Sequence, residues 1–137
     1  MFEIEFSENF EEIDKLADDL LSEYDAENSI EYNFKNFAFV AKENGKSVGY
    51  LTGFSYYSEI TINNLIVLKK YRKKGVGAKL VLQVEKYFAG KGFNNINLVT
   101  NAFQAPRFYE KCGFKLEFIR NNERNPKLTK YFYVKYF

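Results

Sequence analysis

The sequence predicts a mixed α/β (α+β) protein, and three features of its 137 residues indicate this class. Some runs alternate apolar with polar residues, as half-buried strands do, whereas others repeat apolar residues every three or four positions, as amphipathic helices do. The two kinds of run follow one another along the chain, and hydrophobic side chains make up 46% of it. Because this is enough apolar material for one core, we expect a single domain over residues 1–137.

The first expected elements lie in an acidic segment. Residues 2–6 alternate phenylalanine or isoleucine with glutamate, which predicts a strand, and residues 8–24 carry apolar side chains at helical spacing. Residues 1–32 contain twelve of the eighteen acidic residues and a single basic one, so the rest of the chain is basic. This polarity favours a cationic ligand for the early part and an anionic one for the later part, and solvated helix faces would also produce it.

A hairpin and a third strand are predicted next. Residues 37–42 and 47–54 flank the pair Asn44-Gly45, which favours a two-residue turn because both positions accept positive φ. Residues 60–68 are rich in β-branched and apolar side chains and contain no glycine or proline. This third strand should end at the basic loop that follows it.

The second half of the chain predicts helix, strand, helix and two strands. Apolar residues occupy one helical face over residues 76–88, and residues 96–99 form a short apolar run. Pro106 suits the first turn of another helix, which should end at Gly113. Residues 114–119 and 128–137 indicate two final strands, and the aromatic end of the last one would also suit a dimer contact.

The composition excludes several kinds of chemistry. The chain has one cysteine and no histidine, which removes disulfide frameworks, Ser-His and Cys-His catalysis and most zinc sites, so we expect no metal. Proton transfer must therefore use carboxylate, tyrosine, lysine or water. No run approaches the roughly 20 apolar residues of a membrane span, and the first ten residues are acidic where a signal peptide is basic. We expect a cytoplasmic protein with no membrane partner.

The stretch YRKKGVGAKL, residues 71–80, places a basic cluster and two glycines at the start of a predicted helix. The first N–H groups of a helix lack internal partners and its dipole is positive there, so the position favours anions. Gly75 and Gly77 would let a phosphate approach the main chain. The spacing fits neither a Walker loop nor a dinucleotide fingerprint. Taken alone, the loop predicts a diphosphate site or a cationic turn that caps the helix.

Two motifs together resemble the GNAT-type N-acetyltransferase superfamily. Arg72-Lys73-Lys74-Gly75-Val76-Gly77 matches its central motif of Arg or Gln, two residues, Gly, one residue, and Gly or Ala. Phe108-Tyr109-Glu110-Lys111-Cys112-Gly113-Phe114 is similar to its FYEK-x-GF segment. The resemblance is specific over residues 63–119. In the rest of the chain only the order of the expected helices and strands agrees with the family. It implies a mixed, mostly antiparallel sheet that is splayed in the middle to admit acetyl-CoA, with helices on both faces.

The resemblance also implies the cofactor contacts. The strand before the loop would lend backbone groups to the pantetheine arm, and the loop would hold the pyrophosphate. The family often has an asparagine seven residues before the tyrosine of the second motif, where this chain has Ala102, so Asn101 or Gln104 would replace it. The expected cofactor-binding residues are Leu65, Ile66, Val67, Arg72, Lys73, Lys74, Gly75, Val76, Gly77, Ala78, Asn101 and Gln104.

Two residues are candidates for catalysis. Tyr109 matches the family position that protonates the departing CoA thiolate, and the unperturbed pKa values of thiol and phenol, roughly 8.5 and 10, permit this exchange. Its other role would be packing. Glu59 is the candidate base for the amine, or an exposed strand-edge carboxylate. Tyr56 and Tyr57 would line the acceptor pocket or pack, and Cys112 is a packing residue rather than a nucleophile because no histidine can activate it.

The function expected from this resemblance is direct transfer of an acetyl group from acetyl-CoA to a primary amine. The acceptor would be a small molecule or peptide, and the acidic early segment favours a cationic one. A non-catalytic acyl-CoA sensor or interaction module would retain the same fold. We expect no nucleic-acid partner, because the densest basic run lies at the phosphate loop. A monomer and a homodimer are both compatible with the sequence.

Overall fold

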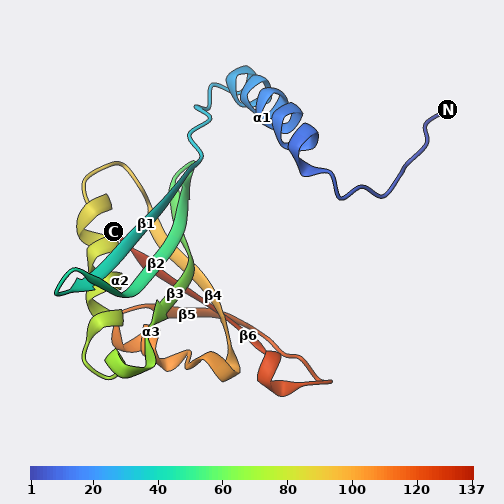
Figure 1. Ribbon diagram of the computed structural model, residues 1–137. Coiled ribbons are helices and arrows are strands. Elements are labelled where there is room, and N and C mark those ends of the chain that lie inside the picture. The colour runs from blue at the N-terminus through green and yellow to red at the C-terminus, as the bar shows by residue number, and fades with distance from the viewer. The chain divides into compact units, whose positions relative to one another are not determined.

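The computed structural model describes residues 1–137 and divides into two compact units, Met1–Asn33 and Phe34–Phe137. The single domain stays a prediction, and each unit is described by itself. The first unit contains helix α1 (Phe10–Glu27), with two acidic residues in its first turn that suit the positive end of the helix dipole (Figure 1). The predicted strand over residues 2–6 is wrong, because residues 1–9 form no regular element. A strand needs a neighbour for its backbone groups, and this unit contains none.

The second unit contains a six-stranded sheet in the order β1-β2-β3-β4-β6-β5. All neighbours are antiparallel except β3 and β4, which are parallel. The hairpin turn at Asn44-Gly45 has positive φ at both residues, as predicted. The mixed, mostly antiparallel sheet is confirmed. Its strands are β1 (Lys35–Glu43), β2 (Lys46–Tyr56), β3 (Glu59–Val67), β4 (Asn95–Asn101), β5 (Lys115–Arg120) and β6 (Lys130–Tyr136).

Two helices of this unit connect the strands. Helix α2 (Val76–Phe88) follows β3 after the basic loop, and helix α3 (Arg107–Lys111) precedes β5. Short 3-10 turns occupy Lys69–Tyr71, Ala102–Gln104 and Pro126–Leu128. No helix of the structure is both long and apolar enough to span a membrane.

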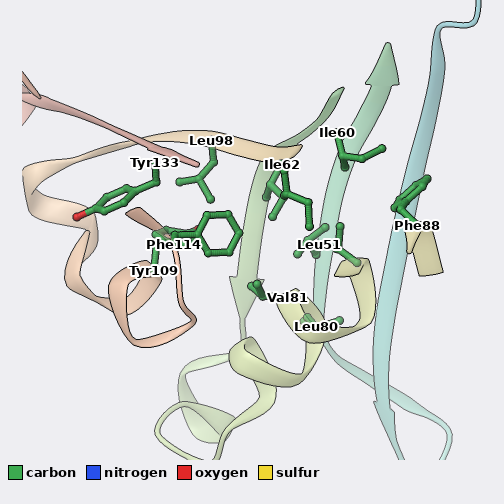
Figure 2. Packing of buried hydrophobic residues seen from close by; sticks show 12 residues of the cluster. Leu51, Ile60, Ile62, Leu80, Val81, Phe88, Leu98, Tyr109, Phe114 and Tyr133 are labelled. Atoms are coloured by element: carbon green, nitrogen blue, oxygen red, sulfur yellow. The ribbon is translucent and has the colours of Figure 1, made fainter. Parts of the chain in front are cut away.

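One hydrophobic core joins both helices to the sheet (Figure 2). Leu51 and Ile60 of the strands are completely buried, and Val81 and Val84 of α2 are buried with them. Tyr109 of α3 belongs to the same core. Burial of these side chains supplies the driving force that holds α2 and α3 against the sheet.

The sheet opens in its middle. Strands β3 and β4 pair only from Glu59 opposite Asn95 to Ile62 opposite Leu98. Beyond this point β3 continues along β2 while β4 continues along β6, so the two strands no longer pair with each other. The β2–β3 register shifts beside the same point, and such a bulge bends a strand and increases its twist. The predicted splay is therefore present between β3 and β4 (Figure 1).

Candidate functional site

A cavity of about 810 Å³ lies where β3 and β4 separate. Its wall combines the end of β3, the basic loop with the first turn of α2, the turn after β4, and α3. These segments are distant in sequence and the core brings them together. The lining residues are Leu65, Ile66, Val67, Tyr71, Arg72, Lys73, Gly75, Val76, Gly77, Ala78, Phe103, Gln104, Ala105, Phe108, Tyr109 and Lys111.

The basic loop is fixed in a conformation that suits an anion. Arg72 Nε donates a hydrogen bond to the main-chain oxygen of Val67 at 2.9 Å, which ties the loop back to β3. Gly75, the N-cap residue directly before α2, has a φ of 82°, which disfavours any residue with a side chain. No side chain caps this helix, so its first backbone N–H groups remain available to a ligand.

Gly77 has a packing role that the sequence did not reveal. A Cβ atom at this position would lie 3.3 Å from Cζ of Phe108 and 3.7 Å from Cδ2 of Leu65. The missing side chain therefore lets the first turn of α2 lie against α3 and β3. This contact joins the two motifs of the sequence, since Phe108 belongs to the second.

Tyr109 is the buried titratable group of the cavity wall. The residue is 9% exposed, and its ring packs against those of Phe114 and Tyr133, with centroid distances of 5.9 and 6.0 Å (Figure 2). The ring of Phe108 lies at a centroid distance of 5.1 Å. Burial, with a smaller contribution from the Cys112 thiol, raises the pKa of Tyr109 to about 12. The phenol is therefore protonated at neutral pH and can donate to a ligand in the cavity.

Asn101 and Gln104 have different positions in the structure. Gln104 lines the cavity, whereas Asn101 does not. Gln104 Oε1 accepts hydrogen bonds from the main-chain N–H and from Nδ2 of Asn101, at 3.1 and 3.0 Å. This reciprocal cap occupies the carbonyl end of Gln104 and leaves its amide Nε2 as the donor. Asn101 thus orients Gln104.

Lys74 lies outside the cavity although its motif neighbours line it. Its Nζ lies 5.5 Å from the ring centroid of Tyr71, and the residue lines a smaller cavity of about 390 Å³ together with Lys42 and Lys79. The basic cluster is therefore divided between two cavities.

Glu59 also lies apart from the predicted catalytic tyrosine. It stands at the start of β3, where Oε1 accepts a hydrogen bond from Asn97 Nδ2 at 2.9 Å. It lines a third cavity of about 310 Å³ with Asn95 and Asn97. The structure does not bring Glu59 to the cavity of Tyr109.

Three further side chains named by the sequence lie outside the large cavity. Tyr56 and Tyr57 stack on each other at the turn after β2, with centroids 4.0 Å apart. Cys112 packs against the core, and its burial raises the pKa of the thiol, with Lys135 acting in the opposite direction. The thiol is therefore protonated at neutral pH.

The prediction missed five residues of the wall. Tyr71, Phe108 and Lys111 lie within or beside the two motifs. Their closeness to the motif residues could therefore have predicted them as part of the wall. Phe103 and Ala105 follow β4, and Ala105 enters the left-handed region with a φ of 59°. No local sequence pattern indicates that turn.

The fold of the chain is similar to those of solved acetyltransferases. A solved acetyltransferase from Bacillus cereus ATCC 14579 is 25% identical, with a TM-score of 0.81 over 100% of this chain and 99% of that chain. An aminoglycoside 6'-N-acetyltransferase complexed with coenzyme A is 20% identical, with a TM-score of 0.63 over 99% and 97%. The ribosomal-protein-S18-alanine N-acetyltransferase of Escherichia coli is 22% identical, with a TM-score of 0.66 over 74% and 68%.

A comparison of the sequence with models of protein families shows the family of this chain. The model of the acetyltransferase (GNAT) family matches residues 1–114, and the chain belongs to this family. No curated protein sequence matches the chain. The resemblance predicted from the two motifs is thus confirmed.

The division of the basic cluster leads to a first prediction. Lys73→Met is expected to weaken CoA binding by about threefold to tenfold at low salt, because a charge-assisted contact to phosphate is lost. The loss should shrink as salt rises. Isothermal titration calorimetry measures both effects.

Lys74→Met is the matched control, because it removes the same charge from the next residue but from the wall of the smaller cavity. We expect its CoA affinity to change less than that of Lys73→Met, since an exposed charge that makes no direct contact with the ligand contributes little. Equal losses in the two variants would contradict a phosphate contact that is specific to the large cavity.

Proposed function

We propose that the protein is an acetyl-CoA-dependent N-acetyltransferase that transfers the acetyl group directly to a primary amine. One observation carries the proposal: a single cavity combines an uncapped helix start beside a basic loop with a buried, protonated tyrosine. Family membership supports acetyl transfer. Nitrogen as the acceptor atom is supported by two structural neighbours whose names specify N-acetylation.

The cavity suggests how the cofactor lies. The pyrophosphate would contact the N–H groups at the start of α2, with Lys73 beside it. The pantetheine arm would run along Leu65, Ile66 and Val67, on the edge of β3 that β4 leaves unpaired. Gln104 Nε2 would donate to an amide carbonyl of the arm, because its own carbonyl is already occupied by Asn101.

The proposed reaction makes a C–N bond and breaks the C–S bond. The neutral amine attacks the thioester carbon, the CoA sulfur leaves with the electron pair of the C–S bond, and the nitrogen then loses a proton. The wall of the cavity contains no carboxylate, so we assign this proton to water rather than to Glu59. Water also supplies the proton that converts the thiolate to the thiol.

Tyr109 has two ways to assist the departing thiolate: complete transfer of its proton, or a hydrogen bond from the phenol. Complete transfer of a proton from a phenol of pKa about 12 to a thiolate is uphill by roughly 5 kcal/mol, since free thiols have a pKa of roughly 8.5. A hydrogen bond from the phenol to the developing thiolate requires no such transfer. We therefore propose that Tyr109 stabilises the departing sulfur as a hydrogen-bond donor.

Tyr109→Phe tests this role, because it removes only the phenolic hydroxyl. Loss of a donor to the developing charge should lower kcat by about 10² to 10³, while CoA affinity stays unchanged. Tyr133→Phe is the matched control, since its ring adjoins Tyr109 but does not line the large cavity. Equal kcat values for Tyr109→Phe and the unaltered protein, with chemistry limiting the rate, would exclude the role.

Gln104→Leu tests the contact to the pantetheine arm. Removal of one hydrogen bond should raise the Kd of CoA by about fivefold. Asn101→Ala should raise it as well, because Gln104 loses the partner that orients it even though Asn101 does not line the cavity. If calorimetry finds the same Kd for both variants as for the unaltered protein, the amide pair has no part in cofactor binding.

The acceptor is proposed to be a cationic amine. Helix α1 carries the exposed carboxylates Glu11, Glu12, Asp18 and Asp19, whose field would attract cations. The aminoglycoside named for one structural neighbour is a substrate of this kind.

Neutral amides in place of these four carboxylates should lower kcat/KM for polyamine or aminoglycoside acceptors and reduce its dependence on salt, because salt screens exposed charges beyond about 10 Å. Amides at Glu43, Glu59, Glu117 and Glu123 change the net charge equally and serve as the control. Steady-state kinetics over a salt series gives the slope of kcat/KM against salt for the unaltered protein, the α1 variant and the control. Identical slopes in all three proteins would show that α1 does not select the acceptor.

A further inference from the structure

We infer that Lys135 is a positioning residue that holds the end of α3 and thereby fixes Tyr109 in the cavity wall. The inference rests on the role proposed for Tyr109. It concerns a side chain of β6 that does not line the cavity.

Lys135 makes two polar contacts that link three elements. Its Nζ donates to the main-chain oxygen of Cys112 at 2.9 Å and pairs with Oε1 of Glu85 at 2.9 Å. Cys112 is the C-cap residue that directly follows α3, and Glu85 belongs to α2. One ammonium group on β6 therefore connects both helices of the core to the sheet.

Helix α3 needs such a contact because it is short. It has five residues, and isolated helices of this length are unstable in water. The turn after the helix supplies N–H groups to the oxygens of Phe108, Tyr109 and Glu110, and Lys135 binds the oxygen of Cys112. A cation at this end also compensates the negative end of the dipole. Lys135 supplies both a donor and a positive charge to the final carbonyl.

Gly113 is adapted to this contact. A Cβ atom here would lie 3.0 Å from Nζ and 3.2 Å from Cε of Lys135. A Cβ at this position would be in tight contact with the ammonium group, which would have to shift to keep its bond to the helix end. The glycine that ends the second sequence motif thus provides space for Lys135 as well as a left-handed turn.

The contact reaches Tyr109 through one turn of main chain. The oxygen of Tyr109 accepts hydrogen bonds from the N–H groups of Cys112 and Phe114, at 3.1 and 2.9 Å. Holding the carbonyl group of Cys112 therefore holds the turn whose amides bind Tyr109. The Phe114 ring packs against the ring of Tyr109, so the same turn supports the backbone and the side chain (Figure 2).

The exposure of the ion pair indicates a local effect rather than a global one. The side chains of Lys135 and Glu85 are 26% and 28% exposed, and partly solvated pairs add little to overall stability. Loss of the donor acts instead on one helix end, where it leaves the Cys112 oxygen without the ammonium group. Local opening of α3 should therefore change more than unfolding of the whole protein.

Native-state hydrogen exchange of Lys135→Met tests the contact. The amides of Gly113 and Phe114, which bond to Glu110 and Tyr109, should exchange about tenfold faster, whereas the β4 amides should change by less than about twofold. Lys86→Met, an exposed lysine one residue from Glu85, is the control and should change neither set. Unchanged exchange at Gly113 and Phe114, or an equal increase throughout β4, would overturn the inference.

A double-mutant cycle tests whether the contact acts through Tyr109. Lys135→Met should lower kcat about tenfold when Tyr109 is present and less than about twofold in the Tyr109→Phe protein, because coupled residues are not additive. A purely structural lysine would lower kcat by the same factor whether residue 109 is tyrosine or phenylalanine. That result would overturn the inference about Lys135 and leave the role proposed for Tyr109 intact. If Tyr109→Phe by itself leaves kcat unchanged, the role of Tyr109 is overturned and the inference with it.

Discussion

The separation of β3 from β4 is the constraint on which the rest of the site depends. The strands share only the ladder from Glu59–Asn95 to Ile62–Leu98, and each then follows its other neighbour. The cavity forms because β3 and β4 are not hydrogen-bonded to each other beyond this ladder, which leaves a gap between them. The core beneath it holds α2 and α3 at the opening, so that the uncapped start of α2 and the buried tyrosine belong to one wall.

The sequence predicted the elements that depend on local pattern. The hairpin follows from Asn44-Gly45, whose turn needs only the conformations of those two residues. Helix α2 follows from one apolar face, and the loop before it follows from its glycines and basic residues. Most predicted cofactor residues line the cavity for the same reason, because the end of a strand, a loop and a helix start are adjacent in sequence.

The sequence did not predict what depends on distance in space. Glu59 and Leu65 belong to one strand, but a rise of about 3.3 Å per residue puts them roughly 20 Å apart, and they line different cavities. The strand over residues 2–6 failed because alternation alone does not supply a pairing partner. The choice between Asn101 and Gln104 required the geometry of their mutual hydrogen bonds.

Amide chemical-shift mapping of the ¹⁵N-labelled protein during a CoA titration tests the central claim most directly. If the cavity between β3 and β4 is the cofactor site, the largest shifts will fall on Leu65–Val67, on Gly75–Ala78 and on Gln104. Saturable shifts confined to the smaller cavities, around Lys42 or around Asn97, would contradict the account, as would the absence of any saturable shift.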